Sequence, residues 1–204
     1  MSFRSKMGCG GIAVLGALLL TGIYAVSTYN TLIRSDQQVQ SQWAQVENAY
    51  QRRLDLVPNL VATVKGAAGF EKSTYLAVAE ARSKVGQVST SSLTKPANDP
   101  AQFQKLQQAQ DGLSSALSRL MVVVERYPDL KATENFRDLQ AQLEGTENRI
   151  AVERMRFNET AQAFNSRRDS FPTNFVAGLS GARFQEKSYF KAQAQAETAP
   201  QVKF

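Results

Sequence analysis

The sequence predicts an all-α fold, with one N-terminal transmembrane helix followed by an extended antiparallel bundle of long helices, similar to a four-helix bundle. Two observations predict this fold class. Residues 7–26 carry no charged side chain, and about 20 apolar residues are enough to cross a bilayer as a helix. From Leu32 onward, apolar residues recur three and four positions apart, and no stretch alternates with the period of a strand.

The basic residues that flank the apolar segment predict its orientation. Arg4 and Lys6 precede it, and the next charged residue is Arg34. The positive-inside rule therefore predicts that residues 1–6 lie in the cytoplasm and that residues 7–26 form a single-pass anchor in the cytoplasmic membrane. The rest of the chain is expected outside the cytoplasm, which means the periplasm if the host is Gram-negative.

A cleaved signal peptide is the alternative interpretation of this segment. Two features argue against it. The apolar run is long for a signal peptide, and Ile23 breaks the small-residue pattern that a cleavage site at Ala25 requires. We therefore expect the anchor to be retained.

One apolar stripe predicts the first helix of the bundle. Its members are Leu32, Val39, Trp43, Val46, Tyr50, Val57, Leu60 and Val64. Because the stripe begins within a few residues of the anchor, we expect the two helices to be nearly continuous, forming a stalk rather than a flexible tether. Pro58 has no N–H to donate to the carbonyl of Leu54, which predicts a kink or a break there.

Prolines and a polar stretch divide the middle of the chain. A second helix is expected over about residues 71–88, before a loop at residues 89–100 that is rich in Ser, Thr and Pro. A third helix, starting near residue 101, is expected to end around Tyr127 because Pro128 follows it.

The last long helix, about residues 131–170, has the clearest periodicity. Every seventh position is apolar: Phe136, Leu143, Ile150, Phe157, Phe164 and Phe171. A strict seven-residue repeat predicts that this helix lies along partner helices over its whole length with a left-handed supercoil. We interpret the row as the core of an antiparallel bundle and also as a candidate assembly surface.

The C-terminal part is apolar but interrupted by glycines. Residues 174–190 have three possible placements: folded back over the bundle, in contact with another subunit, or on the bilayer surface. We expect residues 27–190 to form the bundle domain and residues 191–204 to form a loosely ordered tail.

Two charged residues interrupt the apolar stripes. Arg53 lies on the stripe of the first bundle helix and Glu153 on that of the last. Because an unpaired buried charge is very costly, we hypothesise that Arg53 pairs with Glu147 or Glu153 and fixes the helix register. The alternative is that these are solvated charges at the edges of the stripes.

The composition narrows the functional classes. The chain has 204 residues and a net charge of +6, but its basic residues alternate with acidic ones, which does not indicate nucleic-acid binding. It has no histidine and one cysteine, so an intrachain disulfide and the usual zinc ligand sets are excluded. We expect no catalytic residue, no metal, no cofactor and no nucleic-acid partner.

Several long segments together resemble one known family. They are RRLDLVPNLVATVKG at residues 52–66, Trp43 and Val46 before it, Ala81-Arg82 after it, ERYPDLKATENFRDLQ at residues 125–140, TENRIAVERMRFNE at residues 146–159, and the pairs Phe164-Asn165 and Phe171-Pro172. This set resembles the LemA family of bacterial membrane proteins over nearly the whole chain from Tyr29 to Phe190. The departures are minor: two alanines follow Gly66 where an aromatic residue is frequent, and Phe157-Asn158 replaces a common Tyr-Asn pair.

The resemblance implies an N-terminal membrane anchor, an extended helical bundle and no established enzyme activity. It also associates the chain with envelope processes, membrane-bound proteases and membrane organisation. We expect a non-enzymatic helical scaffold that self-associates at the outer face of the bacterial cytoplasmic membrane, with partners that are the lipid bilayer and further copies of the chain. The alternative is an adaptor or signalling ectodomain that binds another membrane protein, such as a membrane protease.

Overall fold

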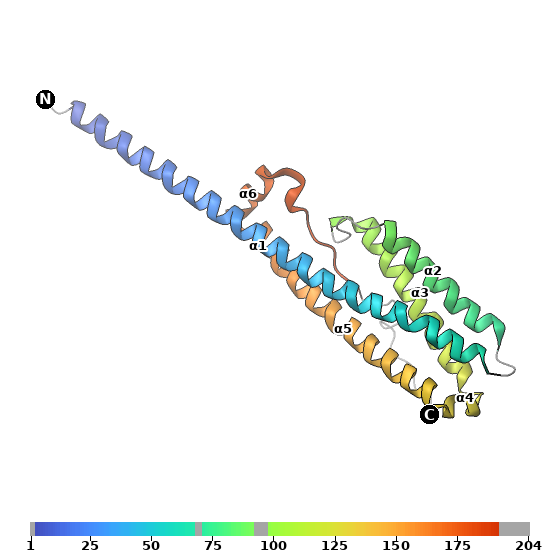
Figure 1. Cartoon of the computed structure of the whole chain (residues 1–204). Helices are drawn as coiled ribbons and strands as arrows, with labels where there is room; N and C mark the ends of the chain where they lie inside the picture. The colour runs from blue at the N-terminus through green and yellow to red at the C-terminus, as the bar shows by residue number, and fades with distance from the viewer. Residues whose placement is uncertain (1–2, 68–70, 92–97, 192–204) are drawn as a thin grey trace, which may run out of the picture.

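The computed structural model describes residues 3–67, 71–91 and 98–191, with their side chains except those of residues 3–13 and 89–91. Its elements in chain order are α1 (Phe3–Lys65), α2 (Lys72–Ser91), α3 (Pro100–Val124), α4 (Pro128–Ala132), α5 (Glu134–Asp169), α6 (Thr173–Leu179) and the 3-10 helix η2 (Gly181–Phe184) (Figure 1). Every regular element in this part of the chain is a helix, which confirms the predicted all-α fold.

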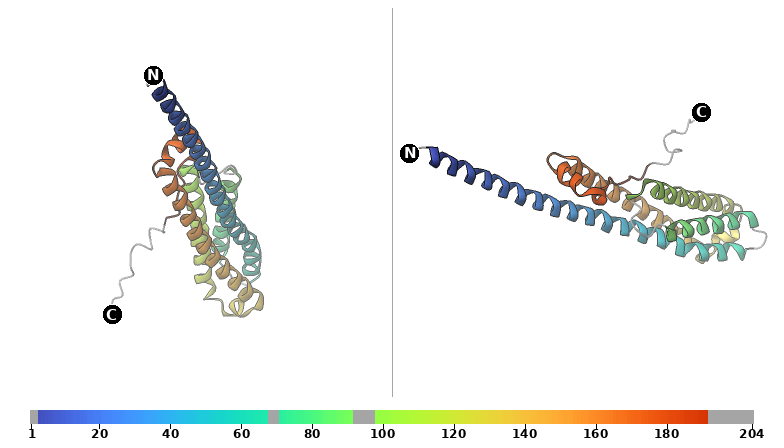
Figure 2. Two further views of the ribbon diagram at one scale, coloured as in Figure 1. Left: turned by 90° about the vertical axis from the view of Figure 1, so that its left-hand side faces the viewer. Right: turned by 90° about the horizontal axis from the view of Figure 1, so that it is seen from above.

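Two antiparallel helices, α1 and α5, lie side by side and define the length of the bundle (Figure 1). The pair formed by α2 and α3 covers them toward the C-terminal end of α1. At the opposite end, α6 packs against both α1 and α5 where α1 leaves the bundle, and α1 then projects alone (Figure 2). We call the core around residues 54–64 of α1 the distal half of the bundle, and the core around residues 32–50 the proximal half.

The predicted stalk is a single helix. α1 runs without interruption through the apolar segment and the first bundle stripe. All eight members of that stripe are buried, and Leu32 and Val64 at its two ends are each 0% exposed. The apolar segment and the bundle therefore share one helix axis instead of being joined by a linker.

Of the predicted kink or break at Pro58, the break is wrong, because α1 continues through Pro58 to Lys65. Proline deprives the carbonyl of Leu54 of its usual intrahelical donor. Arg82 of α2 replaces that donor: its Nε donates to the Leu54 carbonyl oxygen at 3.0 Å. Leu56 and Val57 are buried beside this point. A tertiary hydrogen bond and side-chain packing thus hold the helix together across the proline.

The two halves of the core differ in composition. The distal half is mainly aliphatic and draws on α1, α2, α3 and α5: its most buried members are Val57, Leu60, Val64, Val78, Val85, Leu113, Leu120 and Phe136. The proximal half centres on Trp43, whose ring centroid lies 5.4 Å from that of Phe157 and 5.7 Å from that of Phe103. Phe190, from the C-terminal segment, stacks on Trp43 at 5.9 Å.

The last predicted helix requires two corrections. It is divided into α4 and α5 at Thr133, whose backbone is extended and whose hydroxyl donates to the Leu130 carbonyl at 2.7 Å. The seven-residue row is buried from Phe136 to Phe164, but Phe171 is 79% exposed. Because Pro172 disfavours helical backbone in the residue before it, α5 ends at Asp169 and Phe171 leaves the stripe.

Two further expectations concern segment ends. α2 continues to Ser91, so the loop predicted from residue 89 begins later than expected, and residues 92–97 of it lie outside the described part of the chain. The tail predicted at residues 191–204 also lies outside it, apart from Lys191.

Candidate functional site at the proximal end of the bundle

The segment Gln185–Lys191, which we call the C-terminal strap, folds back along the bundle without helical structure. Two asparagines of α5 supply hydrogen bonds that its backbone lacks. Asn165 Nδ2 donates to the carbonyl of Lys187, and Asn165 Oδ1 accepts from the N–H of the same residue, both at 2.9 Å. Asn158 makes the same two bonds with Phe190, again at 2.9 Å each. Each amide side chain therefore pairs with one strap residue as a neighbouring strand would.

The spacing of these residues explains why the pairing is repeated. Asn158 and Asn165 are seven residues apart on a helix, which is two turns and about 10.5 Å. Lys187 and Phe190 are three residues apart in extended chain, which is about 10 Å. The two Phe-Asn pairs of α5 thus place each phenylalanine in the core and the following asparagine against the strap.

A buried ion pair lies under the strap. Lys187 is 2% exposed, and its Nζ lies 2.5 Å from Asp36 Oδ1 of α1 and 2.6 Å from Asn98 Oδ1. The same ammonium lies 4.8 Å from the ring centroid of Phe164. A buried lysine is costly unless it is paired and hydrogen-bonded. These contacts therefore join the strap, α1 and the residues just before α3 at one point.

Arg154 of α5 contacts the other end of the strap, at Phe190. Its Nε donates to the Tyr50 hydroxyl at 2.8 Å, and its guanidinium lies 5.0 Å from the Phe190 ring centroid. Burial raises the pKa of Tyr50, while the charge of Arg154 and its hydrogen bond oppose that rise. Tyr50 therefore carries its proton in the folded protein at neutral pH.

The predicted charged residues lie at two different places. Arg53 is 0% exposed, and its Nη1 lies 2.7 Å from Glu147 Oε1 and 2.6 Å from Ser114 Oγ. It also donates to the side chain of Gln110. Glu153 does not meet Arg53: its carboxylate accepts from Gln42 Nε2 at 2.7 Å and from Arg156 Nη1 at 3.2 Å. The fixing of register by the Arg53–Glu147 pair stays a prediction.

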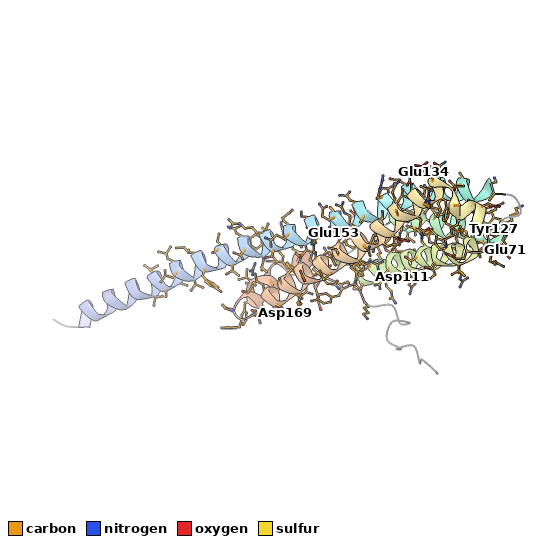
Figure 3. All side chains as sticks on the ribbon, turned by 90° about the horizontal axis from the view of Figure 1, so that it is seen from below. Glu71, Asp111, Tyr127, Glu134, Glu153 and Asp169 are labelled. Atoms are coloured by element: carbon orange, nitrogen blue, oxygen red, sulfur yellow. The ribbon has the colours of Figure 1, made fainter. Side chains whose placement is uncertain are left out.

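The elements α6 and η2 close the proximal end of the bundle. Phe184 of η2 packs edge-on against Tyr29 of α1 at 5.6 Å between ring centroids. Arg168 Nε donates to the Phe184 carbonyl at 2.7 Å, and Arg167 donates to the Ser35 hydroxyl. Asp169, which ends α5, lies beside the point where α1 leaves the bundle (Figure 3). The proximal end is therefore attached directly to α1.

Beyond this point α1 exposes a continuous apolar surface. Among the described side chains, α1 is the one helix that is long and apolar enough to cross a membrane. Seven of its aliphatic residues are each at least 60% exposed: Val14, Leu15, Leu18, Leu19, Leu20, Ile23 and Val26. Such a surface is not stable in water and fits the hydrocarbon of a bilayer.

The polar contacts of this site attach the strap and the other proximal elements to α1 and α5. Within the part of the chain that the structure describes, no group of three or more His, Cys, Asp or Glu side chains is placed to hold a metal ion. The buried charge of Lys187 is paired with Asp36, and that of Arg53 with Glu147, whose side chain is 40% exposed. Sequence reasoning missed the Lys187–Asp36 pair and the asparagine contacts. The available signal was the repeat of Phe-Asn at an interval of seven residues.

Comparisons with known proteins identify relatives of this chain. The model of the LemA family matches residues 42–204. The magnetosome protein MamQ 2 of Paramagnetospirillum magneticum is 26% identical, over 95% of this chain and 77% of its own length. MamQ of Magnetospirillum gryphiswaldense is 26% identical over 97% and 80%, and protein LemA of Metamycoplasma hominis is 26% identical over 80% and 71%. None of these names is that of an enzyme.

Proposed function

The chain belongs to the LemA family and is a membrane-associated protein, and we propose that it is a non-enzymatic scaffold that self-associates on the outer face of the bacterial cytoplasmic membrane. In this proposal residues 7–26 cross the membrane with the N-terminus in the cytoplasm. The bundle stands outside the cytoplasm and contributes to membrane or envelope organisation. Its partners are the lipid bilayer and further copies of the chain.

The continuity of α1 is the observation that carries the proposal. One helix from Phe3 to Lys65 contains both the apolar segment and the first stripe of the bundle. A flexible linker would leave each bundle free to rotate, whereas a continuous helix gives all bundles on a membrane the same orientation. Surfaces with a common orientation meet repeatedly in the same geometry, which favours ordered assembly.

The test compares two insertions of seven residues between Val26 and Ser27 in the full-length protein. An alanine-rich heptad keeps α1 helical and rotates the bundle by only about 20°. A Gly/Ser heptad of equal length interrupts the helix and leaves the bundle on a flexible tether. Electron microscopy of the proteins in lipid vesicles, together with crosslinking, reports on assembly. We expect order with the wild-type chain and the helical insertion, and loss of order with the flexible one.

The proposal fails if the wild-type protein with its anchor is a monomer at all concentrations in detergent and in lipid. It also fails if the two insertions behave alike. Capture of one stoichiometric membrane-protein partner, without any homo-oligomer, would instead support an adaptor function.

A further inference from the structure

We propose that the outward face of α6, together with Phe171, is a second membrane contact that inserts into the outer lipid headgroup layer. This inference rests on the proposed membrane span, and it concerns a different part of the chain. The surface consists of Phe171, Phe175 and Leu179, which we call the apolar face. Its partner is the lipid surface that surrounds α1.

The exposure of the apolar face is unusual for the bundle. Phe171, Phe175 and Leu179 are 79%, 65% and 90% exposed. They lie four residues apart, and the ring centroids of the two phenylalanines are 5.9 Å apart in an edge-on contact. Ala177, on the opposite side of α6, is 7% exposed and faces the bundle. α6 is therefore packed on one side, and on the other its two large apolar side chains lie exposed next to Phe171.

The position of the apolar face matches the outer end of the span. Arg167 of α5 contacts Ser35 of α1, and the two helices run antiparallel. Four residues beyond Arg167, at about 1.5 Å each, place Phe171 near the level of Thr31. That level is about 7 Å above Val26, the end of the apolar segment. The headgroup layer on each side of a bilayer is about 5–8 Å thick.

The charges around the apolar face suit an anionic surface. The stretches 27–36 and 165–187, which form this end of the bundle, contain five basic and three acidic residues, a net charge of +2. Of the acidic residues, Asp36 is paired with Lys187 and Asp169 with Arg168. Arg34 and Arg183 are exposed at this end of the bundle. Basic residues around an apolar helix face are typical of helices that lie in the headgroup layer.

A second copy of the chain is the competing occupant of this face. Phe171 and two side chains of a seven-residue helix form a much smaller surface than the roughly 800 Å² per partner that a stable interface buries. The apolar face also lies at the end of the bundle from which the exposed apolar surface of α1 projects, since α6 contacts α1 there. The bilayer is therefore the occupant that the geometry favours.

The test places tryptophan reporters in the full-length protein in vesicles with brominated lipids, which quench nearby indoles. The native chain has one tryptophan, Trp43, which is buried in the proximal core and gives the baseline. The reporter is Phe175→Trp. The matched control is Val122→Trp on α3, because Val122 is 71% exposed. Leu20→Trp reports on the span itself.

We expect quenching of the Phe175→Trp and Leu20→Trp reporters and none at Val122→Trp. The helical seven-residue insertion after Val26 raises the bundle by about 10 Å. In that chain the quenching at Phe175→Trp should be lost while that at Leu20→Trp persists.

Two other results overturn the inference. Quenching at Phe175→Trp by aqueous acrylamide but not by bromolipid would show that the apolar face lies in water. Quenching by neither would show that another copy covers it. If Leu20→Trp is quenched in these cases, only the second contact is refuted. If Leu20→Trp is not quenched either, the proposed span fails as well.

Discussion

The distal and proximal halves of the bundle contain the same two long helices but differ in what covers them. In the distal half, α2 and α3 complete a four-helix arrangement around mainly aliphatic side chains. In the proximal half, α3 still contributes Phe103 and Leu106, and the C-terminal strap, α6 and η2 complete the cover around a cluster of aromatic rings. Helices satisfy their own backbone hydrogen bonds, whereas the strap needs Asn158 and Asn165 to do so.

The two halves differ because α2 and α3, which cover the pair formed by α1 and α5, are shorter than that pair. α2 and α3 have 20 and 25 residues, while α5 has 36. The shorter pair therefore cannot cover the longer one to its proximal end. Segments without long helices complete the cover there, so the proximal half depends more on specific polar contacts. Mutations at matched positions in the two halves test this dependence.

The largest effects are expected from truncating one core residue in each half. Phe157→Ala should lower the free energy of unfolding by about 4 kcal/mol and Leu113→Ala by about 3 kcal/mol, because both side chains are 0% exposed. The two variants should differ in which part of the chain loses its packing. Phe157 contacts Phe190 at 5.4 Å, so limited proteolysis should cut residues 185–191 faster only in Phe157→Ala. Equal cutting in both would contradict a separate role for the strap.

The next effect concerns the two carboxylates that were equivalent candidates in the sequence. Glu147→Ala leaves the buried Arg53 without its acidic partner and should cost about 3 kcal/mol. Glu153→Ala removes contacts to Gln42 and to Arg156, whose side chain is 57% exposed, and should cost about 1 kcal/mol. Urea unfolding of both variants measures the difference. If Arg53→Met leaves stability and assembly unchanged, the proposed role of the pair in fixing the register is wrong.

A smaller effect is expected from each asparagine that holds the strap. Asn165→Ala leaves the N–H and carbonyl of the buried Lys187 without partners and should cost about 2 kcal/mol. Hydrogen exchange should accelerate in residues 185–191 and stay unchanged in α2 and α3. Asn148→Ala, at an exposed position of α5, is the control. Acceleration throughout the bundle would mean that the two halves unfold as one unit.

The smallest effect is a change of stability in alkaline solution. Since burial raises the pKa of Tyr50, the folded state holds this proton more tightly than the unfolded state. The contribution is complete below the usual tyrosine pKa of about 10 and is lost as the pH rises through the higher folded value. Tyr50→Phe should therefore lose less stability than the wild type between about pH 9 and pH 11.

The sequence predicted the parts of the fold that depend on periodicity. The first bundle stripe is buried throughout, and the seven-residue row is buried as far as Phe164. Periodicity did not reveal where a helix ends or whether it continues through a proline. Phe171 continues the row in sequence but follows the end of α5. Pro58 interrupts hydrogen bonding in sequence, but Arg82, 24 positions downstream, supplies the missing donor.

The candidate site was less predictable because it depends on contacts between distant segments. Arg53 was recognisable as a charge on an apolar stripe, and its pairing was limited to two carboxylates. The strap gave no such signal, since an extended segment has no fixed register against a helix. Lys187 and Asp36 are 151 positions apart, and nothing local indicates that they meet. Only the three-dimensional path of the chain brings them together.

Because α1 is uninterrupted, a tilt of its apolar segment also tilts the bundle. From Val26 to Lys65 the helix is about 58 Å long. Transmembrane helices tilt by about 20° on average, and the tilt changes with the thickness of the hydrocarbon layer. Since no joint separates the apolar segment from the bundle, a tilt of about 20° displaces the distal end by about 20 Å parallel to the membrane. On the proposed span, a change in local bilayer thickness would thus move the distal end of the bundle along the membrane.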